Sequence, residues 1–161
     1  MSFQIHLENI MLILSIIVPY LFLFIFKPHK PWPKVEGLRY QIINLLIHLG
    51  QLAVFIVLLT STITLKGMSK IVVIIGIFFI IAIYYLVWIH YIEKGRRIEV
   101  LYEPMLHIKT PLTLLPLIYL ILCCLLIQSV IGILIVIGYG SLEVGLTRQF
   151  YYKIKKQDHA M

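Results

Sequence analysis

Four long apolar segments make up most of this chain and restrict it to a membrane fold. They run from Asn9 to Phe26, from Gln41 to Leu65, from Ile71 to Glu93 and from Pro111 to about Thr147. A soluble core of this size could not cover so many apolar side chains, whereas lipid accepts them on every face of a helix. The composition agrees, since 61% of the 161 residues are hydrophobic and 13% are charged. We therefore expect an all-α polytopic transmembrane helical bundle, with residues 1–161 forming a single integral membrane domain.

The number of spans depends on the last apolar segment. It is too long for one span, which needs about 20 residues, and barely long enough for two. A turn near Gln128 and Ser129 would give five spans, at about residues 9–26, 41–65, 71–93, 111–127 and 130–147. Thr110 and Pro111 are suitable N-cap and first-turn residues for a helix that starts there. Without the turn, the chain would have four spans.

The positions of Lys and Arg favour five spans. With five spans, one side of the membrane holds twelve of the fourteen basic residues, whereas four spans would divide them eight against six. The larger group consists of Lys27, Lys30, Lys34, Arg39, Lys94, Arg96, Arg97, Lys109, Arg148, Lys153, Lys155 and Lys156, and the smaller of Lys66 and Lys70. The positive-inside rule then predicts a multi-pass cell-membrane protein with its amino terminus outside and its carboxyl terminus in the cytoplasm. Abundant Ile and Lys with little Ala indicate an AT-rich genome and fit a bacterial cytoplasmic membrane.

Two further features of the sequence have expected structural roles. Residues 95–109 mix apolar and charged side chains, so we expect an interfacial segment on the cytoplasmic side, broken at Pro104. In the final span, Gly138, Ser141 and Gly145 are three and four residues apart and would let another helix approach closely.

Cys123 and Cys124 are adjacent within a run of Leu and Ile. This spacing matches neither a CxxC redox pair nor a metal site, so we interpret both as small core residues.

The second span contains a polar stripe formed by Gln41, Asn44, His48 and Gln51. Their spacings of three, four and three residues put all four on one side of a helix. Five spans place His48, His90, Glu93 and Glu143 at similar depth in the cytoplasmic leaflet, where ionisable groups usually face a bundle interior or a wet cavity. The candidate polar pocket therefore consists of Asn44, His48, Gln51, His90, Glu93 and Glu143.

Each of these residues also has a purely structural interpretation. His48 could form a hydrogen bond between helices without any ligand. His90 and Glu93 are close enough to the interface to extend into the headgroups beside an aromatic belt. Glu143 needs either a basic partner, such as His48, His90 or Arg148, or retention of its proton.

Several enzyme classes are excluded by missing residues. The only aspartate is Asp158, so a hydrolase with an aspartate pair or an Asp-rich metal-dependent phosphotransferase would have no ligands. No HExxH, GxSxG or CxxC motif occurs, no two histidines have metal-ligand spacing, and no cofactor motif is present. What remains for catalysis is an unspecific pair of His and Glu.

Two functional hypotheses follow. The first is a small non-enzymatic membrane protein, either an accessory or protective subunit or a small-solute carrier, whose polar pocket lies in the cytoplasmic leaflet. Its expected partners are the lipid bilayer, anionic headgroups, and a membrane protein or a second copy of the chain. The alternative is an enzyme for a lipid or lipid-linked substrate, with Lys94, Arg96 and Arg97 as headgroup or phosphate contacts. Nucleic acid is not expected, because the basic residues are explained by membrane orientation.

Overall fold

The computed structural model describes residues 7–28, 37–105, 108 and 110–158. Within this part of the chain it forms helices and no strand, which confirms the all-α prediction. The helices are α1 (Leu7–Ile25), α2 (Leu38–Thr60), α3 (Gly67–Glu93), α4 (Ile98–Tyr102), α5 (Pro111–Leu126) and α6 (Val130–Asp158). Three described segments are long and apolar enough to cross a membrane: α2, α3 and Val130–Ile154 of α6. These helices indicate a membrane protein.

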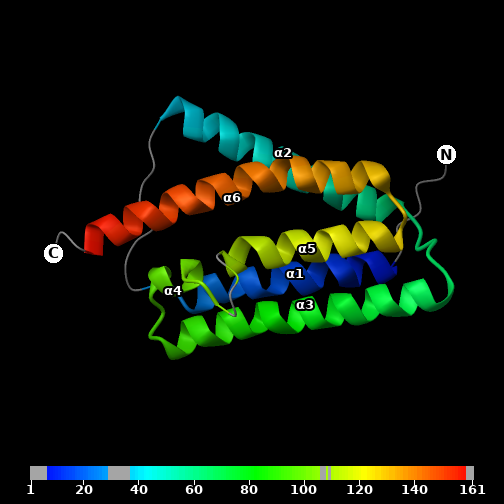
Figure 1. Ribbon diagram of the computed structural model, residues 1–161, viewed down its shortest axis with the longest axis horizontal. Coiled ribbons are helices and arrows are strands. Elements are labelled where there is room, and N and C mark those ends of the chain that lie inside the picture. The colour runs from blue at the N-terminus through cyan, green and yellow to red at the C-terminus, as the bar shows by residue number, and fades with distance from the viewer. Residues whose placement is uncertain (1–6, 29–36, 106–107, 109, 159–161) are drawn as a thin grey trace.

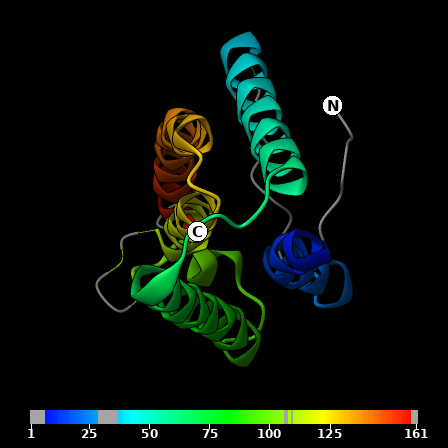
Figure 2. The ribbon, with the colours of Figure 1, turned by 90° about the vertical axis from the view of Figure 1, so that its right-hand side faces the viewer.

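The five long helices run along the long axis of the molecule, and consecutive ones point in opposite directions (Figure 1). Seen end on, α6, α5 and α3 form one row, with α5 in the middle, and α1 and α2 form a second row beside it (Figure 2). The short helix α4 lies at the end of the bundle where α3 ends and α5 begins (Figure 1). We call this the α4 end and the opposite end the far end.

Helix α5 is the most enclosed element of the bundle. Most of its side chains are buried, because α3 and α6 pack on either side of it. Cys123 and Cys124 are fully buried and unpaired, as expected of small core residues. The α5 helix ends at Leu126 and α6 starts at Val130, so the helix break coincides with the turn expected at Gln128 and Ser129. Gln128 adopts a positive φ of 54°, and the Ser129 backbone N–H donates to the Cys124 carbonyl at 2.9 Å.

Polar groups satisfy the helix termini at the far end. The Asn9 side-chain nitrogen donates to the carbonyls of Leu58 and Ser61, at 2.6 and 2.5 Å, and so ties α1 to the end of α2. The backbone N–H groups of Thr64 and Leu65 both donate to the Leu126 carbonyl at the end of α5. Such bonds matter in lipid, where no water can satisfy the last carbonyls of a helix.

The segment expected at the membrane interface is partly drawn into the bundle. Leu101 is fully buried and Tyr102 is 8% exposed, because α4 packs against α3, α5 and α6. The α4 helix ends at Tyr102, two residues before Pro104. Since α5 has only 16 residues, α4 fills the space beside its first turn. The sequence did not reveal this burial, because charged residues flank the apolar ones.

The prediction that Gly138, Ser141 and Gly145 let another helix of this bundle approach closely is wrong. A Cβ atom added at Gly138 or Gly145 would meet no atom within 4 Å, and Ser141 is exposed. The close approaches occur elsewhere: an added Cβ would lie 2.6 Å from Tyr139 at Gly50 and 2.8 Å from Leu117 at Gly140. The reason is the rotation of α6, which turns the side containing Tyr139 and Gly140 towards α2 and α5.

The last helix also extends beyond the expected end near Thr147 and reaches Asp158. Its final turns contain Arg148 and Lys153, and cations near a helix C-terminus interact favourably with the helix dipole. The helix therefore does not stop where the apolar run stops.

Candidate functional site

Hydrogen bonds join three residues of the polar stripe of α2, while the fourth, Gln41, is exposed and does not line the cavity described below. Asn44 Nδ2 lies 3.3 Å from His48 Nε2, and His48 Nδ1 lies 3.3 Å from Gln51 Oε1. With these amide orientations, Asn44 donates to Nε2 and the ring donates from Nδ1 to Gln51, which fits the neutral imidazole with its proton on Nδ1. Both bonds fall within one helix, where residues three and four apart are neighbours.

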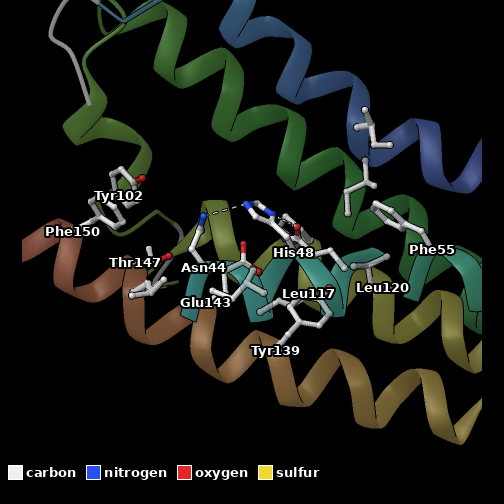
Figure 3. Close-up of a pocket in the computed structure, with 16 residues that line it drawn as sticks. Asn44, His48, Phe55, Tyr102, Leu117, Leu120, Tyr139, Glu143, Thr147 and Phe150 are labelled. Carbon is white, nitrogen blue, oxygen red and sulfur yellow. Dashed lines mark hydrogen bonds between the residues drawn. The ribbon is translucent and has the colours of Figure 1, made fainter. Parts of the chain in front are cut away.

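Glu143 reaches this stripe from α6. The two helices approach closely where Gly50 faces Tyr139, one turn before Glu143. Glu143 then forms a hydrogen bond with the Gln51 side chain and lies within electrostatic range of His48. Since the Gln51 oxygen accepts from His48, its NH₂ group is the part that faces the carboxylate. Hydrogen bonds thus connect Asn44 through His48 and Gln51 to Glu143. Figure 3 shows the bond between Asn44 and His48, with Glu143 nearby.

These four polar residues line a cavity of about 450 Å³. A volume of this size falls in the range of small-molecule sites, which are typically apolar with a few converging polar groups. Helices α1, α2, α4, α5 and α6 contribute to it, and Figure 3 shows its labelled side chains. The remaining lining residues are Ile16, Ile17, Ile47, Phe55, Tyr102, Pro116, Leu117, Leu120, Tyr139, Leu146, Thr147 and Phe150.

The lining of the cavity is fixed by contacts between elements. Thr147 bonds to Thr113 of α5 at 2.9 Å between the two hydroxyl oxygens, and both residues are buried. Phe150 meets Tyr40 of α2 edge to face, with ring centroids 5.8 Å apart. These contacts join α6 to α5 and to α2 next to the cavity, so the positions of its walls follow from helix packing.

The four aromatic rings of the lining were not predicted as site residues. They are Phe55, Tyr102, Tyr139 and Phe150. No sequence signal distinguished them, because aromatic side chains occur along all the apolar segments. The buried α4 was the missing information for Tyr102.

His90 and Glu93 do not join the cavity. Both lie at the end of α3, and no residue of α3 is among those that line it. Glu93 is exposed and His90 is partly exposed, which fits the alternative in which they extend towards the headgroups. Depth alone had grouped them with His48, but α3 lies on the opposite side of α5 from α6 (Figure 2).

The candidate phosphate contacts also have other partners. The Arg96 guanidinium lies over the Phe26 ring at 5.5 Å from its centroid, and Arg97 forms an ion pair with Glu99 at 3.8 Å. The carboxylate that pairs with Arg97 is therefore that of Glu99. Lys94 is exposed and caps the end of α3 with its backbone N–H.

A metal site is not formed by the residues that the structure describes, since no three His, Cys, Asp or Glu side chains gather there. A second cavity of about 360 Å³ lies nearer the far end, between α1, α3 and α5. Its lining is almost entirely apolar, with Glu8 and Ser15 as its polar residues apart from the Tyr119 hydroxyl. That hydroxyl bonds to Ser15 and to the Leu12 carbonyl, both at 2.7 Å.

Comparisons with protein-family models, curated proteins and solved structures find no match to this chain.

Proposed function

We propose that the protein spans the membrane five times, with its amino terminus outside and its carboxyl terminus in the cytoplasm. The alternating directions of α1, α2, α3, α5 and α6 support this topology (Figure 1). Among the described residues, Lys66 and Lys70 lie at the far end, and the other Lys and Arg side chains lie towards the α4 end. By the positive-inside rule, the α4 end is the cytoplasmic one.

The short α5 fits this topology despite its length. Its 16 residues span about 24 Å at 1.5 Å per residue, less than the roughly 30 Å of the hydrocarbon core. Most of α5 is surrounded by protein, so little of its surface would face lipid. Its two ends meet other parts of the chain. The α4 segment and the residues after α2 occupy the two ends.

Within this topology, the protein is a non-enzymatic membrane protein that holds a small amphiphilic molecule, either as a carrier or as an accessory or protective subunit. The observation that supports this function is a cavity whose lining combines the polar side chains of Asn44, His48, Gln51 and Glu143 with a majority of apolar side chains. An amphiphile would place its polar part on the chain from Asn44 to Glu143 and its apolar part against the leucine and isoleucine side chains.

The test is native mass spectrometry of the protein purified in a mild maltoside detergent. We expect a bound species of defined mass that is lost in Ile17→Trp, because Ile17 lines the cavity and a larger side chain would fill it. The matched control is Val18→Trp on the same helix; Val18 is 37% exposed and does not line the cavity. Equal occupancy in both variants would contradict binding in this cavity. Light scattering of the same samples separates the two roles, since a subunit should form a defined oligomer or retain a partner.

The alternative function is an enzyme for a lipid-linked substrate, and the proximity of His48 to Glu143 favours it. The engagement of Arg96 with Phe26 and of Arg97 with Glu99 argues against these residues as a phosphate site. Lipid analysis of cells that produce His48→Ala or Glu143→Ala tests the enzyme alternative. Accumulation of the same lipid in both variants would favour the enzyme, and unchanged lipids with unchanged growth would exclude it.

A further inference from the structure

The charge of the cavity lining restricts what it can bind. Glu143 is the one acidic residue among the described residues that line the cavity, and no Lys or Arg is among them. Among the described lining residues, His48 is the one other side chain that can carry a charge near neutral pH, and with the amide orientations given above its two hydrogen bonds fit the neutral ring. Glu143 is therefore the group of the described lining that can carry a negative charge, and no Lys or Arg side chain of the described lining is there to balance it.

The aromatic rings add to this preference. Phe55, Tyr102, Tyr139 and Phe150 line the same cavity as Glu143. The faces of aromatic rings attract cations, and more strongly where water is excluded. A carboxylate together with several rings is suited to an ammonium or another soft organic cation.

The rest of the lining determines the shape of the ligand. Isoleucine and leucine side chains from α1, α5 and α6 make up most of the remaining walls. A small hydrated metal ion would gain nothing from these walls, and the described residues provide no set of three metal ligands. An anion would meet the Glu143 carboxylate without any compensating cation.

From these observations we infer that the cavity binds a monovalent organic cation with a bulky apolar body, whose charge pairs with Glu143. This inference rests on the proposed function and specifies its ligand. The cation can be a free compound or the amine headgroup of a lipid, because both present the same ammonium chemistry.

The test uses two ions of the same shape and opposite charge, tetraphenylphosphonium and tetraphenylborate, with the purified full-length protein in lipid-free maltoside detergent. We expect saturable binding of tetraphenylphosphonium and at least tenfold weaker binding of tetraphenylborate. Glu143→Gln should weaken tetraphenylphosphonium binding at least tenfold. The matched control is Glu93→Gln, since Glu93 is exposed and outside the lining, and it should bind as the unchanged protein does.

The variant Ile17→Trp, with Val18→Trp as its control, separates failure of this inference from failure of the proposed function. If tetraphenylborate binds as well as tetraphenylphosphonium, and Ile17→Trp abolishes both, the cavity binds amphiphiles but the cation preference is wrong. If tetraphenylphosphonium binds and Ile17→Trp has no effect, the site lies elsewhere and both proposals are wrong. Absence of saturable tetraphenylphosphonium binding overturns the cation inference, while the native mass spectrum still tests the cavity.

Competition then distinguishes the two sources of the cation. Phosphatidylethanolamine should displace tetraphenylphosphonium if the natural ligand is a lipid headgroup, whereas phosphatidylglycerol, which has no amine, should not. Failure of both lipids to compete supports a free cation. Equal displacement by both lipids would contradict recognition of the ammonium group.

Discussion

Gly50 and Gly138 make a matched test of how closely the helices pack. An added Cβ would lie 2.6 Å from Tyr139 at Gly50, whereas at Gly138 it would meet nothing within 4 Å. We predict that Gly50→Ala lowers the free energy of unfolding by about 1–3 kcal/mol, because α2 and α6 must move apart. Gly138→Ala should instead leave stability unchanged or raise it by up to about 1 kcal/mol, since Ala favours a helix over Gly.

The measurement is unfolding of both variants in the same detergent, followed by circular dichroism. A Gly50 variant as stable as the Gly138 variant would show that α2 and α6 are not in tight contact. The sequence alone pointed to Gly138 and Gly145, because small residues three or four apart are typical of close helix packing. Which side of α6 faces the bundle depends on the neighbouring side chains, and the glycine spacing does not contain that information.

At the scale of single elements, α1 depends on Asn9 for its attachment to α2. Asn9 is 1% exposed and donates to two carbonyls at the end of α2. We predict that Asn9→Leu costs about 1–3 kcal/mol, because carbonyls at the end of α2 lose their donor while the side chain keeps its branched shape and its number of heavy atoms. Hydrogen exchange should accelerate over the last turn of α2. Met11→Leu serves as the control, since Met11 is 65% exposed, and an Asn9 variant with unchanged exchange would contradict this role.

The sequence predicted how far along each helix the site residues lie. It did not predict which side of each helix faces the site. The spacing of Asn44, His48 and Gln51 correctly put them on one side of α2, and the expected turn at Gln128 gave Glu143 a similar depth. Depth follows from counting residues along a helix. It could not exclude His90, because whether α3 turns towards α2 or away from it depends on packing between helices that are distant in sequence.

For the whole molecule, burial shows how a short central helix can belong to a membrane bundle. Helices α3 and α6 enclose α5, and α4 packs at its first turn. The outer surfaces of α2 and α3 are largely exposed apolar side chains, including Leu45, Leu49, Phe78 and Phe79. Such surfaces suit lipid, while polar groups such as Asn44 and Glu143 face the cavity. The bundle thus combines apolar outer surfaces with a cavity, partly lined by polar side chains, on one half.

The five-span topology makes a prediction about labelling in cells. After Cys123→Ala and Cys124→Ala, single cysteines are introduced by Met68→Cys, Glu103→Cys and Lys153→Cys, all at exposed positions. Gly95 is avoided, because its φ of 74° disfavours other residues. A membrane-impermeant maleimide should label Met68→Cys in intact cells, and the other two only after lysis. Labelling of Lys153→Cys but not Glu103→Cys in intact cells would mean four spans and would separate Glu143 from His48. Labelling of both, with Met68→Cys protected, would keep five spans and reverse the orientation, placing the cavity in the outer leaflet.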